Sequence, residues 1–231
     1  EDKLLQRYAL AVLAFSTRSD SWYNNNGWLT EDDECTWSMW TYYGYYSDVI
    51  CDEQGRVQFI GLSNNQLFDE LPAELYLLSN SLTEIQVNNN ALSGTIPTEL
   101  GLLTQLTHLD LHNNAMWGRI PTELAQLSRL RYLYISRNWF SGPIPPIVLE
   151  AMSNLSVLDV ATNLLTGTIP TVLGAVTELE YVRLSSNLLT GRIPTELGNL
   201  FQLTSLMLGA NQFDPTIPSS LGRLVSLESL D

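Results

Sequence analysis

The stretch LTHLDLHNNAMWGRIPTEL, residues 106–124, decides the fold, because its pattern of apolar residues returns along most of the chain. Leu109 and Leu111 are two residues apart, which is the spacing of a strand that buries one face and exposes the other. Asn114 follows the strand, and Ile120-Pro121 opens the next segment, where the missing N–H of proline costs least. We predict a strand, a turn and a return segment.

The dipeptide Ile-Pro or Leu-Pro recurs every 24 or 25 residues, and a fixed period of that size indicates a stacked array. Its copies begin at residues 71, 96, 120, 144, 169, 193 and 217. We therefore predict one short strand per coil, with the strands of successive coils paired in a parallel sheet at about 4.8 Å spacing. Residues 56–231 would hold about seven full repeats and the start of an eighth.

Asparagine and glycine recur at fixed places in this period. Each predicted strand is followed by an asparagine whose amide is expected to satisfy backbone groups of neighbouring coils; these are Asn65, Asn90, Asn114, Asn138, Asn163, Asn187 and Asn211. Most coils place a glycine two residues before Ile-Pro, which permits a tight bend. Asp69 and Pro215 replace this glycine in the first and last full coils, where we expect a different course.

The resulting consensus, L-x-x-L-x-L-x-x-N-x-L-x-G-x-I-P, resembles the plant-type leucine-rich repeat over residues 57–231. The resemblance implies an α/β solenoid, a right-handed curved superhelix with a helical N-terminal cap. The chain looks similar to the ectodomains of plant receptor-like proteins and to polygalacturonase-inhibiting proteins. Its N-terminal helix also resembles caps of leucine-rich-repeat proteins from diatoms, which suggests an algal member of the family.

Residues 1–55 do not fit the repeat and are predicted to form the cap. DKLLQRYALAVLAFST, residues 2–17, spaces its apolar residues as a helix does, and its predicted buried face holds Leu4, Leu5, Tyr8, Val12 and Phe15. Tryptophans at 22, 28, 37 and 40 would help to cover the open hydrophobic end of the first coil.

The segments CTW (35–37) and CDEQGRV (51–57) resemble the cap of plant extracellular repeat proteins. No histidine lies near Cys35 and Cys51 in the sequence, so a disulfide is favoured over a metal site, and it implies an oxidising compartment. We expect an extracellular or cell-surface location, with Asn154 of Asn154-Leu155-Ser156 as a glycosylation candidate. Four tyrosines in TYYGYYSD, residues 41–48, would form either an exposed patch or packing under the disulfide.

Charge and composition exclude several classes of function. With 25 acidic residues against 11 basic ones, the chain carries −14 and would repel nucleic acid and anionic membranes. It contains no run of 18 apolar residues. Asp110 and Asp159 would lie two coils apart, near the separation of inverting glycosidases, but Arg183 beside Asp159 favours a screened, ionised carboxylate over a poised acid. No nucleophile is flanked by a base, so we predict no enzyme and no cofactor.

The outward residues of the predicted strands form columns on the concave face, which solenoids use for binding. The first column reads Phe59, Glu84, His108, Tyr132, Val157, Tyr181, Ser205, and the second reads Gly61, Gln86, Asp110, Tyr134, Asp159, Arg183, Met207. Tyrosine and arginine are enriched at binding hot spots. The predicted partner-binding residues are His108, Asp110, Tyr132, Tyr134, Arg137, Tyr181 and Arg183.

The pattern His108-x-Asp110-x-His112 raises the possibility of a metal site. Four strand residues span about 13 Å, so one zinc ion cannot bind both histidines, and we predict no metal. For these three residues, the alternative to a binding patch is that they are exposed polar residues of the concave sheet without a functional role. Trp117 and Trp139 would form a second patch on one flank or pack against each other.

These observations predict an extracellular scaffold, such as a receptor-like ectodomain, that binds a protein, a peptide or a small cell-surface ligand. A secreted inhibitor of a cell-wall-degrading enzyme and a structural or adhesive cell-surface protein are the alternatives. LVSLESLD, residues 224–231, starts another coil without a closing cap. An open strand edge invites pairing, so we expect a longer natural chain and either self-association or fraying at this end.

Overall fold

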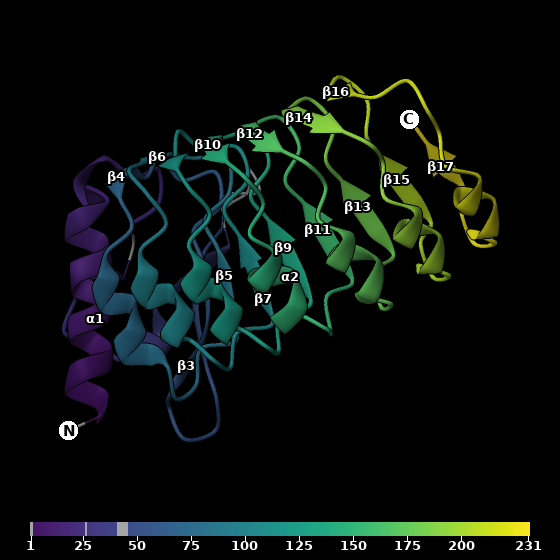
Figure 1. Ribbon diagram of the computed structural model, residues 1–231. Coiled ribbons are helices and arrows are strands. Elements are labelled where there is room, and N and C mark those ends of the chain that lie inside the picture. The colour runs from purple at the N-terminus through teal and green to yellow at the C-terminus, as the bar shows by residue number, and fades with distance from the viewer. Residues whose placement is uncertain (1, 26, 41–45) are drawn as a thin grey trace.

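The computed structural model describes residues 2–25, 27–40 and 46–231, and it shows a solenoid of stacked coils behind an N-terminal helix (Figure 1). The predicted fold class is confirmed. Each coil contributes one strand to a ten-stranded sheet, in which β3 onward run parallel and β1, β2 and β3 pair antiparallel. Its strands are β1 (Ser38–Trp40), β2 (Tyr46–Cys51), β3 (Val57–Gly61), β5 (Glu84–Gln86), β7 (His108–Asp110), β9 (Tyr132–Tyr134), β11 (Val157–Asp159), β13 (Tyr181–Arg183), β15 (Ser205–Met207) and β17 (Ser229–Leu230).

The register of this sheet confirms both predicted columns of outward residues. His108 pairs with Tyr132, and Tyr132 pairs with Val157, as the first column requires. Asp159 lies between Tyr134 and Arg183, as the second requires. One residue of slip would have turned every inward leucine to solvent, so the buried face fixes this register.

A second set of short strands forms the flank where each coil bends. Five of them pair in a parallel sheet: β8 (Trp117–Gly118), β10 (Trp139–Gly142), β12 (Leu164–Gly167), β14 (Leu188–Gly191) and β16 (Gln212–Phe213). β4 (Phe68–Glu70) and β6 (Ala91–Ser93) pair separately. Asp69 takes a positive φ of 61°, like the glycines it replaces, so the expectation of a different course was wrong at the first coil.

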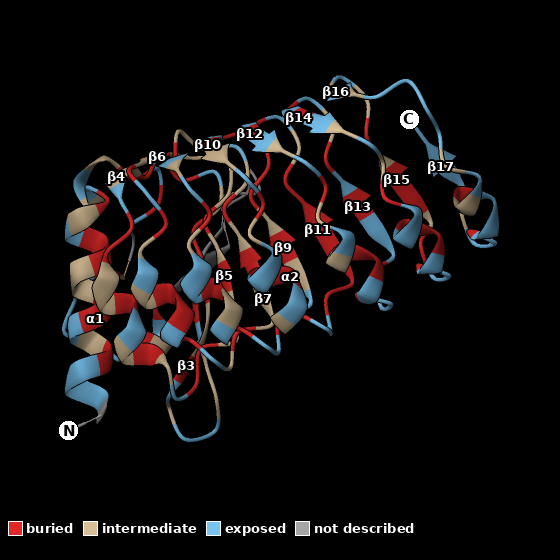
Figure 2. Cartoon of the chain, in the orientation of Figure 1, coloured by how far each residue is buried: buried red, intermediate tan, exposed pale blue. Residues whose placement is uncertain are grey.

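The return segments after each proline are short helices on the side opposite the ten-stranded sheet (Figure 1). Most are short 3₁₀ helices: η3 (Ala73–Leu78), η4 (Thr98–Leu102), η5 (Thr122–Gln126), η6 (Thr171–Ala175), η7 (Thr195–Asn199) and η8 (Ser219–Arg223). One is the α-helix α2 (Pro146–Ala151). Between these turns and the sheet lies a continuous core of leucine, isoleucine and valine, buried along the described array (Figure 2).

The repeated turn asparagines within the array form the predicted ladder. The side-chain amide of Asn138 donates to the carbonyls of Leu111, Ile135 and Ser136 at 2.9–3.2 Å, and its Oδ1 accepts the Met116 N–H at 3.0 Å. Two of these partners belong to the preceding coil. Each amide therefore joins two coils and satisfies backbone groups that the core would otherwise leave unpaired.

The N-terminal helix α1 (Asp2–Ser16) is present as predicted, but the predicted buried face was wrong. Leu4 and Phe15 are 74% and 71% exposed, and Leu5 and Tyr8 are exposed as well. The buried face holds Gln6, Ala9, Leu10, Leu13 and Ala14 instead. Apolar residues lie on both sides of this helix, and Gln6 selects between them: its amide donates to Glu34 and Gly55 and accepts the Val57 N–H.

The remainder of the cap is joined to α1 and to the first coil. Cys35 and Cys51 form the predicted disulfide, with 5.4 Å between their Cα atoms. Trp22, Trp28 and Trp37 are buried, with successive rings 5.0 and 5.3 Å apart, which fits their predicted covering role. The tyrosine-rich segment predicted at 41–48 lies largely outside the described residues.

Candidate binding surface on the ten-stranded sheet

A pocket of about 310 Å³ opens on the outward face of the sheet across β9, β11 and β13. Tyr132 and Tyr134 stand on β9, and Tyr181 and Arg183 stand on β13. Between them β11 carries the shorter side chains of Val157 and Asp159, both buried. Two long residues on each side of two short ones make walls and a floor. Figure 2 shows buried β11 between β9 and the more exposed β13.

The pocket holds charged groups of both signs. Arg183 lies 3.9 Å from Asp159 Oδ2, which is an ion pair without a hydrogen bond, and Glu180 lines the cavity with them. Burial raises the pKa of Tyr134, and the carboxylates of Asp110 and Asp159 raise it further against the opposing effect of Arg183. Burial and the neighbouring carboxylates therefore both favour the neutral phenol of Tyr134.

His108 extends this aromatic surface toward the N-terminus. Its ring centroid is 5.1 Å from that of Tyr132 and 5.7 Å from that of Tyr134. Burial lowers the pKa of His108, against the carboxylates of Glu84 and Asp110, so the imidazole tends to be neutral near pH 7. A neutral, flat ring beside two tyrosines suits packing against a ligand.

Asp110 and His112 are hydrogen-bonded to each other. His112 Nδ1 lies 2.7 Å from Asp110 Oδ1, which also accepts the His112 backbone N–H at 3.1 Å. Over the described ranges of the chain, no group of three or more His, Cys, Asp or Glu side chains is arranged to hold a metal.

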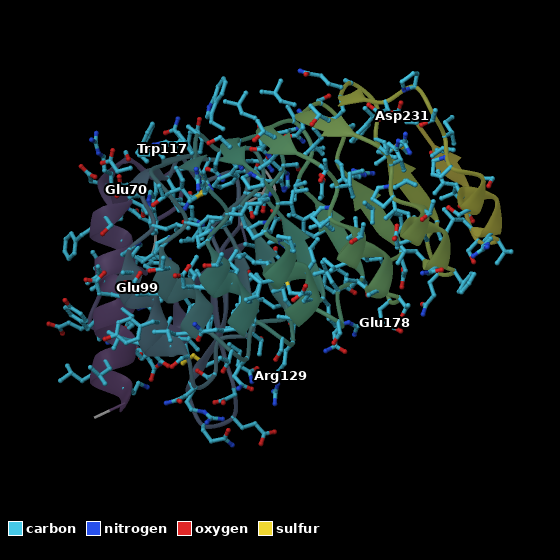
Figure 3. All side chains as sticks on the ribbon, viewed as in Figure 1. Glu70, Glu99, Trp117, Arg129, Glu178 and Asp231 are labelled. Atoms are coloured by element: carbon cyan, nitrogen blue, oxygen red, sulfur yellow. A yellow bond between two sulfur atoms is a disulfide. The ribbon has the colours of Figure 1, made fainter. Side chains whose placement is uncertain are left out.

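Arg137, the remaining predicted site residue, lies away from this pocket. It is exposed, has a φ of 54° and lines a separate hollow of about 470 Å³ with Trp139 and Thr162. Trp117 and Trp139 are Cα partners on β8 and β10, yet both residues are more than half exposed, and no ring contact is found between these two described residues. Figure 3 labels Trp117 at the flank, far from Arg129 at the opposite edge.

The glycosylation candidate Asn154 follows α2 and is exposed, with its amide donating to the Ser128 carbonyl at 2.9 Å. Its accessibility is compatible with modification, which remains a prediction. Among the described residues, no helix is long and apolar enough to cross a bilayer.

Val157, Asp159 and Glu180 line the pocket but were not among the predicted partner-binding residues, although Val157 and Asp159 stood in the predicted outward columns. A usable signal was present in the columns. Each column places a short side chain, Val157 or Asp159, between two long ones on the neighbouring coils. Alternation of long and short residues along a column predicts a hollow because neighbouring strands are about 4.8 Å apart.

Stacked parallel strands, a ladder of turn asparagines and an N-terminal cap define a repeat-built solenoid scaffold. The chain is a leucine-rich-repeat protein: residues 81–103, 105–127, 129–150 and 178–200 match the family model described as Leucine Rich Repeat. A comparison with curated protein sequences finds no match.

Solved structures of plant repeat proteins resemble the chain closely. The ectodomain of the Arabidopsis receptor kinase HAESA, solved with an IDA peptide hormone ligand, is 32% identical with a TM-score of 0.84, over 98% of this chain and 36% of that one. A TDR receptor is 36% identical with a TM-score of 0.74, over 76% and 30%. The chain thus spans about a third of these receptors' length.

A plant ice-binding protein is 25% identical with a TM-score of 0.79, over 99% of this chain and 78% of that one. The predicted likeness to algal proteins finds no support in these comparisons.

Proposed function

We propose that this chain is an extracellular binding scaffold, part of a receptor-like ectodomain, and that it recognises a peptide or protein ligand on the outward face of the ten-stranded sheet. One observation carries the proposal: the pocket across β9, β11 and β13 is built from side chains that the repeat does not require. Positions free of packing duties are where a solenoid varies its specificity.

Two further observations support the proposal. Tyrosine and arginine, which form most of the pocket walls, are the residues most enriched at binding hot spots. The HAESA ectodomain, with which the chain shares its fold at 32% identity, was solved with a peptide hormone ligand. The Cys35–Cys51 disulfide fits an oxidising, extracellular compartment.

An inhibitor of a cell-wall-degrading enzyme and an adhesive protein would use the same face. The identity of the recovered partner separates these alternatives, because an inhibitor must bind a folded enzyme and suppress its activity. None of them requires a catalytic group on this chain.

Ice binding is a second candidate function. It is favoured by the likeness to the plant ice-binding protein over nearly the whole chain, and by the flank sheet, where Leu164, Leu188, Thr166 and Thr190 are exposed at regular coil spacing. Inhibition of ice-crystal growth by the purified chain, lost on Thr190→Tyr, would support it. Unaltered crystal growth would remove it.

Two tyrosines of equal exposure provide a direct test of the leading proposal. Tyr181 in the pocket and Tyr76 on η3 are each 39% exposed, but they lie on opposite sides of the coil. A binding screen against secreted peptides and cell-surface extracts would identify the partner. Tyr181→Ala should weaken the binding free energy of that partner by more than about 1 kcal/mol. Tyr76→Ala should leave binding unchanged. Damage confined to Tyr76→Ala would contradict the assignment of the face.

A further inference from the structure

We propose that the pocket across β9, β11 and β13 accepts a basic side chain, a lysine or arginine, of the ligand. This inference rests on the proposed function in taking the ligand to be a peptide or protein. It adds the chemical class of the group recognised, which neither the family nor the related structures assign. The argument uses the shape of the pocket, the floor carboxylate and the charges around it.

The shape of the pocket suits a slender, partly apolar group. Tyr132 and Tyr181 flank Val157 on neighbouring strands, so their Cα atoms are two strand spacings apart, about 9–10 Å. After the thickness of the rings is subtracted, this gap admits one alkyl chain or one planar guanidinium between them. Val157 at the floor offers apolar contact for the stem of such a side chain.

The floor beside Val157 carries a carboxylate with unused hydrogen-bonding capacity. Asp159 is only 8% exposed and lines the cavity. Its Oδ1 accepts the Ala161 N–H at 3.2 Å, whereas Oδ2 has Arg183 at 3.9 Å and accepts no hydrogen bond from the described residues. A nearly buried carboxylate is stabilised when a cation donates to its free oxygen. A lysine ammonium or a guanidinium supplies that donor.

The pocket walls and the surrounding charges also favour a positively charged ligand group. Tyrosine faces attract cations through the ring quadrupole, and three tyrosines line this cavity. Glu180 adds a second carboxylate to the lining, and Asp110 lies two strands from Asp159, on the far side of Tyr134.

Among the described residues, Arg183 is the one cation in the pocket lining, and it acts as a competitor for Asp159; Arg131 lies outside the lining, with its guanidinium 5.9 Å from the centroid of the Tyr132 ring. Its side chain is 53% exposed, and its 3.9 Å separation from Oδ2 is too long for a hydrogen bond. An incoming basic group can displace the guanidinium to solvent, because Arg183 is half exposed and makes no hydrogen bond to Oδ2 that would have to be broken. A ligand carboxylate would gain Arg183 alone and face both Asp159 and Glu180.

The test uses three small probes titrated into the whole chain and followed by NMR. N-acetyl-lysine N-methylamide carries the stem and the charge, N-acetyl-norleucine N-methylamide carries the stem alone, and N-acetyl-glutamate N-methylamide carries the opposite charge. We expect the lysine probe to bind roughly tenfold more tightly than the norleucine probe, with a weaker preference at high salt. We expect the glutamate probe to bind weakest.

Variants of the charged groups assign the preference to the pocket. Asp159→Asn should abolish the advantage of the lysine probe, and Arg183→Gln should increase it. Glu180→Gln, at an exposed position, should reduce it partly and gives an answer if Asp159→Asn misfolds. Asp214→Asn is the control, because Asp214 forms an ion pair of similar length, 3.7 Å, with Arg192 at a more exposed position away from the pocket. It should change nothing.

Each remaining result overturns the inference. Equal binding of the lysine and norleucine probes, tighter binding of the glutamate probe, no binding of any probe, or a preference that survives Asp159→Asn and Glu180→Gln would each do so. Failure of the proposed function gives a different result from failure of this inference. In that case Tyr181→Ala does not change binding of the partner found in the screen, while the lysine probe still binds the pocket. If binding of the partner is weakened by Tyr181→Ala but unchanged by Asp159→Asn, the basic side chain is contradicted and the assignment of the binding face stands.

Discussion

Tyr134 and Asn138 lie four residues apart on the same coil, yet different requirements determine them. Asn138 is nearly buried and makes four hydrogen bonds to backbone groups, two of which belong to the preceding coil. Tyr134 points outward into a pocket, and the equivalent positions of the neighbouring coils hold Asp110 and Asp159. Residues repeated in every coil maintain the stack, and residues that change from coil to coil are available for recognition.

The largest expected effect is a loss of stability when one of the repeated core leucines is truncated. Leu133 is 2% exposed and lies between Tyr132 and Tyr134 on β9. Leu133→Ala should lower the free energy of unfolding by about 2–5 kcal/mol, through lost burial and the cavity left behind. Denaturant titration measures it. Tyr134→Ala should cost much less, and equal losses would erase the distinction between the two sides of the strand.

A somewhat smaller effect is expected from the ladder. Asn138→Ala leaves the Met116 N–H and three carbonyls without their amide partner, at about 1–3 kcal/mol per buried group left unsatisfied. Some of these carbonyls gain water or share other donors, so we expect a total near 3 kcal/mol by thermal or chemical unfolding. A neutral result would show that the asparagines are repeated for another reason.

A favourable change of about 1 kcal/mol is expected one position before the ladder asparagine. The residue there has a positive φ in each coil: Asn64, Asn89, Asn113, Arg137, Thr162, Ser186 and Ala210. This conformation is strained for a β-branched residue and tolerated by asparagine. Thr162→Asn should therefore raise the free energy of unfolding by about 1 kcal/mol. Asn113→Thr, the reverse change in another coil, should lower it similarly. Opposite signs would contradict this account.

How far the sequence predicts the structure differs between these two sets of positions. The period fixed the strands, the register and both outward columns, because every coil repeats the same constraint. Helix α1 has no such repetition, and its apolar residues on both sides gave the wrong face; the hydrogen bonds of Gln6 decided it. The pocket depends on the relative lengths of side chains on three coils, and the bond between Asp110 and His112 depends on a rotamer. Neither is visible in a consensus.

The smallest expected effect is a dependence on pH. Burial lowers the pKa of His108 from its ordinary value of 6.5, so the folded chain holds fewer protons at this site than the unfolded chain just below that pH. Stability is then greatest above pH 6.5 and decreases as the pH falls toward the folded-state pKa. His108→Gln should lose less stability than the unchanged chain between pH 7.5 and 5. Parallel losses in unfolding titrations would show that His108 does not contribute.

The asparagine ladder that joins each coil to the one before it also sets the distance between the cap and the pocket. The cap fixes the first coil through Gln6 and Asn65, the latter bonded to Asn24 in place of a preceding coil. Beyond that origin each coil contacts only its neighbours, so a duplication or deletion of one 24-residue unit between the cap and β7 would preserve the pocket. It would shift the pocket along the axis by one strand spacing, about 4.8 Å. The distance between cap and pocket can thus change only in whole coils, and insertions of other lengths would interrupt the asparagine ladder.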